Sequence, residues 1–221
     1  MASYFRVTQP VGEPVSLAQA KSALNVDSDI TADDLFIGML IQGAREYAEG
    51  YCNRSFLTQS WRLTLNSFGD VSAGGDGPFL GSVQIEKAPI QSIDSITYLD
   101  MGGALQTITN PGTPQATATV AVEQKFALDL DGNVGRISPA FGFIWPITLP
   151  QIGAVKINFT AGYGLVADSP SKVPAGIANW ILMRVCTLYQ NREEVAVMPR
   201  GKVEALPYVD RLLDNFVVSL A

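Results

Sequence analysis

The sequence contains no histidine and only two cysteines among its 221 residues. Histidine is the commonest general base near neutral pH, the usual partner of a serine or cysteine nucleophile, and the commonest metal ligand. Cys52 and Cys186 are too few for a disulfide scaffold or a complete zinc site, and we expect both to be reduced core thiols. These absences argue against an enzyme and against any bound metal or cofactor.

Positive charge is also scarce, with 15 Lys and Arg against 21 Asp and Glu and a formal net charge of -6. Tight nonspecific binding of nucleic acid comes from basic side chains that release phosphate counterions, so this balance argues against it. DNA could still pass nearby without binding. No basic leader with an apolar run begins at Met1, and no apolar run is long enough to cross a bilayer. We therefore expect no membrane partner.

Capping residues and apolar side chains at helical spacing predict helices near both ends of the chain. Ser16 and Gln19 form a capping-box pattern that predicts a short helix ending near residue 25. Thr31 is predicted to cap a second helix over residues 32–53, with Ile30 and Leu35 as a hydrophobic staple. Two more helices are predicted: one after Pro174, with an apolar stripe from Ile177 to Tyr189, and a short amphipathic one over 208–218. Four aromatic side chains at helical spacing are expected in the core or in a helix–helix interface: Tyr47, Tyr51, Trp180 and Tyr189.

Between these helices the hydrophobic period changes to two, which is typical of half-buried strands. We expect strands at 60–66, 83–86, 93–99, 105–108, 117–122, 126–130 and 155–160, with a hairpin turn at 100–103 and an extended arm at 1–13. Neither long helix can bury its apolar stripe alone. The sequence therefore predicts an α+β fold: a helical bundle formed by residues 1–57 and 169–221, with an antiparallel β domain, 58–168, inserted between them.

Three acidic or glycine-rich segments are candidates for chemistry. Residues 129–133 resemble a calcium loop without its spacing, so a turn is the favoured interpretation. Residues 162–164 lack the lysine of a phosphate-binding loop. Adjacent residues on a helix point in different directions, as Glu193 and Glu194 would. A carboxylate-dependent hydrolase using Asp129, Asp131, Glu193 and Glu194 is the least favoured alternative.

Several segments, taken in order, resemble one protein family. They are residues 15–21 with Asp27, 33–54, 58–65, 87–98, 159–164, 173–174 and 189–193. In this order the chain resembles the head-tail connector (adaptor) family of long-tailed bacteriophages. Residues 69–78, 109–116 and 139–152 match no pattern of that family and are candidates for contact with a tail partner.

The resemblance implies a structural protein of the virion neck, assembled in the host cytoplasm. It would form a ring of twelve copies beneath the portal protein, join the portal to a stopper or tail-completion protein, and let DNA pass through its bore. Portal contacts are expected from the segment 199–221, through Tyr208, Leu212, Leu213 and Phe216. Lateral contacts between subunits are expected from exposed polar positions of the long helices, at Arg45, Glu49, Arg192 and Glu193. Another phage tail-assembly or minor virion structural protein is the alternative.

Overall fold

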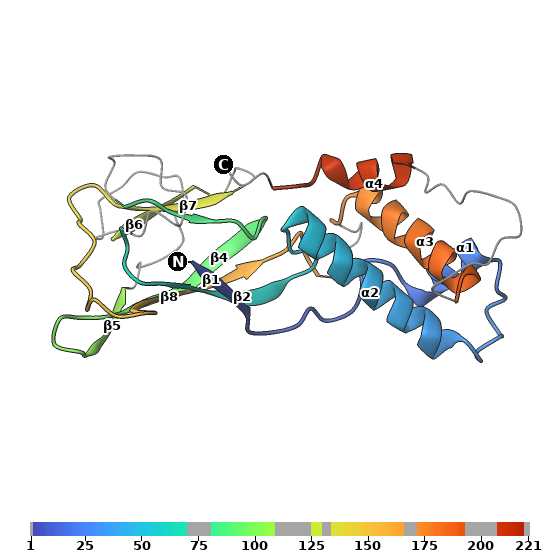
Figure 1. Cartoon of the computed structure of the whole chain (residues 1–221), viewed down its shortest axis with the longest axis horizontal. Coiled ribbons are helices and arrows are strands. Elements are labelled where there is room, and N and C mark those ends of the chain that lie inside the picture. Colours follow the sequence, from blue (N-terminus) through green and yellow to red (C-terminus); the bar gives the residue numbers. More distant parts are fainter. Residues whose placement is uncertain are drawn as a thin grey trace, which may run out of the picture. The chain divides into compact units, whose positions relative to one another are not determined.

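The computed structural model describes residues 2–69, 81–108, 125–129, 134–165, 172–192 and 207–218. The contacts within the chain divide it into two compact units. Figure 1 colours the chain by position in the sequence, from blue at the N-terminus to red at the C-terminus. We call residues 1–9, 58–162 and 218–221 the β unit, and residues 10–57 and 163–217 the helical unit. Helices and antiparallel strands occupy separate units of one chain, so the predicted α+β class is confirmed.

The β unit contains a five-stranded sheet in the order β1-β2-β8-β4-β5 and a three-stranded sheet in the order β3-β7-β6. All pairings are antiparallel. The strands are β1 Ser3–Arg6, β2 Gln59–Leu65, β3 Val83–Ile85, β4 Ile90–Leu99, β5 Leu105–Ile108, β6 Phe126–Asp129, β7 Gly135–Pro139 and β8 Val155–Ala161. Buried and more exposed residues alternate strictly along β2 and β8, so the five-stranded sheet has one apolar and one polar face.

Both sheets contribute to one apolar core. Leu63 of β2 and Ile157 of β8 are completely buried in it. At Gly135 of β7, an added Cβ would lie 2.0 Å from Cδ1 of Ile90 on β4, so the backbone of the small sheet approaches the large one closely. A larger residue at position 135 would require the Ile90 side chain to move. Among the described residues, this core contains no charged side chain.

The helical unit contains α1 Leu17–Leu24, α2 Asp34–Cys52, α3 Ala175–Gln190 and α4 Pro207–Asp214. Residues of α2 and α3 share one apolar core although more than a hundred residues separate these helices in the sequence, as Figure 1 shows. Trp180 of α3 is buried there, and its ring stacks on Tyr47 of α2 at 5.8 Å between centroids. Within the described residues, no helix combines the length and hydropathy that a membrane span needs.

The predicted start of α1 is confirmed. Ser16 accepts a hydrogen bond from the backbone of Gln19, and the Gln19 side chain accepts one from the backbone of Ser16. Asn25 ends the helix in a left-handed conformation, with φ of 55°. Such local signals need only neighbouring residues, which is why the sequence carries them.

The predicted start of α2 is wrong. The helix begins at Asp34 rather than residue 32, and Leu35 is 79% exposed and so forms no buried staple with Ile30. Lys21 organises this turn instead, because its buried ammonium pairs with Asp34 at 2.5 Å and donates to the Ile30 carbonyl at 2.7 Å. A lysine reaching from another helix leaves no local sequence signal.

Two strands were not predicted. Residues 1–13 were expected to form an extended arm, but Ser3–Arg6 is β1, which pairs with β2 so that Ser3 lies opposite Thr64. Gly135–Pro139 is β7, between β3 and β6. Both strands are five residues or shorter, which is too few to show a clear period of two. The predicted strand at 117–122 lies outside the described residues.

Candidate assembly surfaces

The described acidic and sulfur-containing side chains do not gather into a chemical site. In the described ranges, no group of three or more His, Cys, Asp or Glu could hold a metal ion. Asp129 ends β6, whereas Asp131, Glu193 and Glu194 lie outside the described residues. A hollow of about 720 Å³ beside α1 contains Lys21, which is already paired with Asp34. The expected absence of a cofactor stays a prediction.

Arg45 and Glu49 are buried, which contradicts their predicted place at exposed positions of α2. The Arg45 guanidinium donates to Glu13 at 2.7 Å and to Glu49 at 2.9 Å, and Glu49 also accepts the backbone N–H of Phe56 at 2.9 Å. Burial lowers the pKa of Arg45, but Glu13 and the neighbouring carboxylates outweigh it and raise the pKa overall. These two residues fasten the segments before and after α2, so lateral contact with another subunit is not available to them here.

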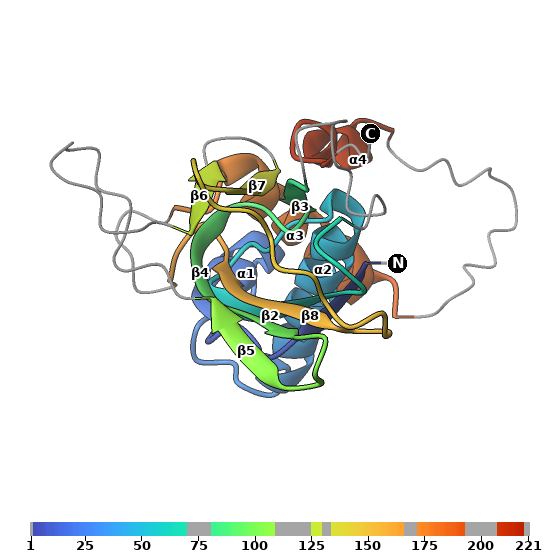
Figure 2. The same cartoon turned by 90° about the vertical axis from the view of Figure 1, so that its left-hand side faces the viewer.

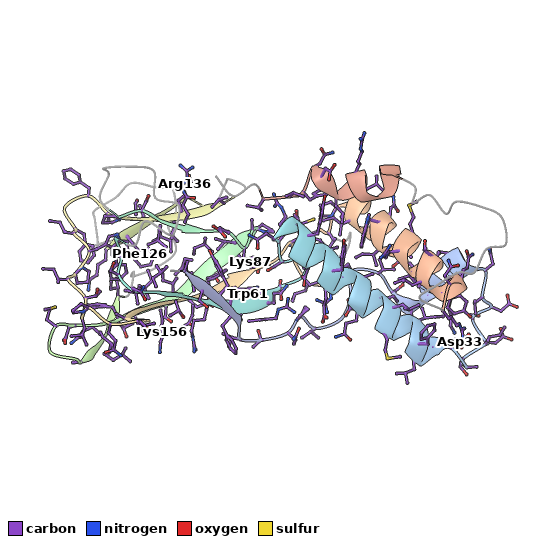
Figure 3. The ribbon with its side chains drawn as sticks, in the orientation of Figure 1. Asp33, Trp61, Lys87, Phe126, Arg136 and Lys156 are labelled. Atoms are coloured by element: carbon purple, nitrogen blue, oxygen red, sulfur yellow. The ribbon has the colours of Figure 1, made fainter. Side chains whose placement is uncertain are left out.

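Arg192 lies at the junction of α2 and α3. Its guanidinium contacts Asp33 at 3.1 Å and lies 4.9 Å from the ring centroids of Tyr189 and Phe36. The Tyr189 hydroxyl donates to Asp33 at 2.5 Å, and this hydrogen bond, together with the charge of Arg192, lowers the pKa of Asp33. The same hydrogen bond to Asp33 raises the pKa of Tyr189, and Arg192 opposes that rise. Figure 3 labels Asp33 at the start of α2. Arg192 is half-exposed and stays a candidate for lateral contact, while Glu193 lies outside the described residues.

The short helix α4 docks on its own helical unit. Leu213 is 1% exposed in the helical core, and Leu212 and Phe216 are partly buried against that core. Arg54 donates from Nε to the Phe216 carbonyl at 2.5 Å. The sequence left docking on the same chain or on a neighbour open, and here it is on the same chain. Leu213 can touch a portal only if α4 leaves this position, and the side chain of Tyr208 is not described.

Sequence reasoning missed one surface, the exposed face of α2. Tyr47 and Tyr51 were expected in the core or in a helix–helix interface. One side of each meets another helix, since Tyr47 stacks on Trp180 of α3 and the Tyr51 hydroxyl donates to Asp214 of α4, but they are 59% and 45% exposed. The buried stripe lies elsewhere on the helix, because Ile41, Ala48 and Cys52 face the core. Only Glu46 is charged among the exposed residues of α2, which are Leu35, Met39, Gln42, Gly43, Glu46, Tyr47, Gly50 and Tyr51. We call these eight residues the α2 face. A helix face that stays in water is normally rich in charge, so this scarcity was the signal available in the sequence.

Two glycines on the α2 face strengthen this observation. A Cβ at Gly43 or Gly50 would meet nothing within 4 Å, so the chain's own packing does not require glycine at either position. Each glycine inside a helix costs about 1 kcal/mol relative to alanine. No contact within the chain explains this loss of helix stability at Gly43 and Gly50. Close approach of the backbone of another subunit would explain it.

Several basic side chains of the β unit are already engaged by neighbouring residues. Arg62 donates to Asn158 at 2.9 Å, and Asn158 donates to Ser95 at 2.8 Å. Arg6 and Lys87 lie over the Trp61 ring at 4.9 and 5.2 Å, and Figure 3 labels Lys87 and Trp61. The expectation that DNA passes without specific binding stays a prediction.

Comparison with known proteins identifies the relatives of this chain. Residues 14–97, which run from the segment before α1 into β4, match a family model described as Phage gp6-like head-tail connector protein. The predicted resemblance to head-tail connectors is confirmed. No curated protein sequence matches the chain.

Chains in solved structures of gene transfer agent (GTA) particles share the fold of this chain. A chain from the neck of an empty GTA particle, computed with C6 symmetry, is 21% identical and superposes with a TM-score of 0.71, with 99% of this chain and 97% of that chain covered. A chain from the virion of a native GTA particle is 21% identical, with a TM-score of 0.69 and coverage of 99% and 96%. One from a native neck computed with C12 symmetry is 21% identical, with a TM-score of 0.65 and coverage of 99% and 97%. These likenesses show that the chain shares its fold with chains of the GTA neck and virion structures.

Proposed function

We propose that this chain is a noncatalytic head-tail connector of a phage-like particle. Its copies form a ring beneath the portal protein, join the portal to a stopper or tail-completion protein, and leave a bore through which DNA passes. The observation that carries the proposal is the match of residues 14–97 to the connector family. A similar solved neck was computed with C12 symmetry, which supports a ring of twelve copies.

In this proposal the two ends of the chain close a helical bundle, and the β portion is an insertion between them. The shared core of α2 and α3 supports this arrangement. The predicted boundaries of 1–57, 58–168 and 169–221 differ from the two units at three places. Residues 1–9 and 218–221 belong to the β unit, and residues 163–168 belong to the helical unit. The bundle would present the α2 face for assembly, while the β unit would meet the next component of the neck.

Lateral contacts between copies use the α2 face in place of Arg45 and Glu49. In a ring every subunit contact is heterologous, so one surface of each copy meets a different surface of the next. The face offers four large apolar side chains: Leu35, Met39, Tyr47 and Tyr51. Gly43 and Gly50 leave room beside them for a second backbone. Residues 199–221 are the proposed portal contact, with release of α4 from its own unit as a condition for Leu213.

Ring formation tests the proposal. Purified protein is mixed with portal particles and examined by mass photometry and negative-stain electron microscopy. We expect the wild type to add a ring of subunits to the portal. Met39→Asp places a charge on the α2 face and should reduce ring formation at least tenfold. Val11→Asp is the matched control, because Val11 is 84% exposed and lies outside the α2 face, and it should assemble like the wild type.

Two results would contradict the proposed function. A wild-type protein that stays monomeric and ignores portal particles would remove the connector role. A subunit found outside the neck of purified particles would favour another tail-assembly or minor virion protein. Equal ring formation by Met39→Asp and wild type would leave the connector role in place but would overturn the lateral contact through the α2 face.

A further inference from the structure

The segment 140–152, which connects β7 with β8, displays an unusual set of apolar side chains. Phe141, Ile144, Ile147 and Ile152 are each at least 79% exposed. No charged residue occurs between Arg136 and Lys156, so this segment has none of the charges that normally accompany exposed chain.

The β4–β5 hairpin extends the same surface. The N–H of Leu149 donates to the carbonyl of Leu99 at 3.0 Å, and the N–H of Leu99 donates to the carbonyl of Ala154 at 2.9 Å. These bonds hold the segment beside the base of the hairpin, as Figures 1 and 2 show from two sides. Met101 and Leu105 of the hairpin are 61% and 67% exposed. We call residues 140–152 together with the hairpin tip, 100–105, the apolar end of the β unit.

The segment is held in a defined conformation. Trp145 stacks on Phe68 at 4.5 Å between centroids, and its Nε1 donates to the Gly81 carbonyl at 2.6 Å. Gly142 has φ of +81°, which side chains other than glycine rarely adopt. One aromatic side chain thus anchors the segment while its neighbours point to solvent. Binding to a surface that is already ordered loses less conformational entropy.

The size of the apolar end and its low charge indicate what covers it. Its one charged residue is Asp100, whose carboxylate accepts hydrogen bonds from Gly102, Ala104 and Gln106 within the hairpin. Six exposed side chains of this size present on the order of 800 Å², which is what one partner contributes to a standard protein interface. Single exposed apolar residues are normal, whereas six on one short segment and the hairpin bonded to it indicate an interaction site. Nucleic acid does not fit, because the surface offers no Lys or Arg for its phosphates.

A second copy of the chain is the less suitable occupant. A heterologous contact within a ring would need a second surface of low charge, and the α2 face, the other such surface described above, is already assigned to lateral contact in the proposed function. The described solvent face of the five-stranded sheet carries Arg62, Lys156 and Asn158 instead. We propose that the apolar end of the β unit docks a different protein of the neck, one whose contact surface is apolar and uncharged. This proposal rests on the proposed connector function and names the chemistry of its next partner.

A complementation assay tests the docking surface. Purified full-length protein is added to an extract that holds heads and tails but lacks the connector, and tailed particles are counted by negative-stain electron microscopy. Wild type and the control Val11→Asp should restore tail joining. Ile144→Asp should still form rings with portal particles but should yield at least tenfold fewer tailed particles. Its thermal midpoint should equal that of the wild type, because the side chain is exposed.

A photocrosslinking amino acid at position 141 identifies the occupant directly. In assembled particles it should join the 23.7 kDa chain to a different polypeptide. Products at multiples of 23.7 kDa, or loss of rings by Ile144→Asp, would show a contact between copies and overturn the proposal. Binding of wild type to phosphatidylcholine–phosphatidylglycerol vesicles that Ile144→Asp abolishes would indicate a lipid surface and also overturn it. Equal tail joining by Ile144→Asp and an active wild type would overturn this inference alone, whereas an inactive wild type would overturn the connector function with it.

Discussion

The two units stabilise their cores in different ways. Among the described residues, the helical unit buries four charged side chains, whereas the core of the β unit buries none. The four are Lys21, Arg45, Glu49 and Arg54. In the helical unit each of these charges holds an irregular segment against a helix: the turn before α2, the segments flanking α2, or the chain after α4. Strands satisfy their own backbones through the ladders of a sheet. Loops packed beside helices have no such ladder, so side chains must bond to their backbone groups. Charged side chains fill this role in the helical unit and are therefore buried.

The largest expected loss of stability comes from replacing Glu49, one of the buried charges of the helical unit. Glu49→Ala leaves the Arg45 guanidinium buried beside a lost partner and removes the acceptor of the Phe56 N–H. Removing one member of a buried ion pair costs about 3–5 kcal/mol of unfolding free energy, which urea unfolding measures. Glu46→Ala is the control, because Glu46 is exposed and lies 3.5 Å from Arg45, and such pairs contribute about 0.2–1 kcal/mol. Equal losses from the two variants would contradict the importance assigned to the buried pair.

In the β unit we expect stability to depend on close packing rather than on buried charge. Gly135→Ala drives a methyl group into Ile90 Cδ1, and overpacking of this kind costs about 1–3 kcal/mol. Urea unfolding again gives the value. The double variant with Ile90→Val keeps a branched side chain but removes Cδ1, so it should recover part of the loss. No recovery would show that the clash is with the backbone instead.

On the α2 face a glycine-to-alanine substitution should raise the stability of the protein, whereas Gly135→Ala should lower it. Gly43→Ala meets no neighbouring atom and replaces a poor helix former, so the free energy of unfolding should rise by about 1 kcal/mol. The added methyl group should nevertheless weaken ring formation, because the proposed lateral contact needs close approach. Measuring thermal stability and ring mass on one sample separates the effects. A variant that is both more stable and better assembled would argue against the α2 face as an interface.

The two thiols of the helical unit should react at different rates. Burial raises the pKa of Cys52 to about 11, against a smaller opposing effect of Arg54. Burial also raises the pKa of Cys186, but that side chain is partly exposed. At pH 8 iodoacetamide should therefore modify Cys186 at least tenfold faster than Cys52, as peptide mass spectrometry measures. Equal rates in the folded protein would show that the helical core opens readily.

The smallest expected effect is a pH dependence at Asp33. The hydrogen bond from Tyr189 and the charge of Arg192 lower its pKa in the folded state. Its carboxylate therefore favours folding above its ordinary pKa, and this contribution disappears as the pH falls through the lowered value. Asp33→Asn should be slightly less stable than the wild type at pH 7 and should lose that difference under acid conditions. A difference that grows in acid would have the wrong sign.

The sequence predicted what short-range patterns determine. The capping box of α1 needs only Ser16 and Gln19, and the alternation in β2 and β8 repeats over seven residues. By contrast, β1 is a four-residue edge strand whose pairing with β2 lies far along the chain. Its partner, rather than its own pattern, makes it a strand.

The candidate sites were harder to predict because they depend on distant partners. Arg45 and Glu49 lie on a helix and looked like surface charges, but Glu13 lies 32 residues away from Arg45. The heptad stripe placed Tyr47 and Tyr51 inside, while the shorter Ala48 and Cys52 face the core. Neighbouring positions are about 100° apart around a helix, and apolar residues occur at both sets here, so a spacing of three and four residues does not decide which set faces the core. The scarcity of charge on both exposed surfaces is a signal that needs no partner and could have been used.

The mass of the complex between the purified chain and portal particles tests the central claim most directly. The account predicts an added mass equal to a ring of 23.7 kDa subunits, present with wild type and absent with Met39→Asp. A chain that stays at 23.7 kDa in the presence of portal particles would contradict it.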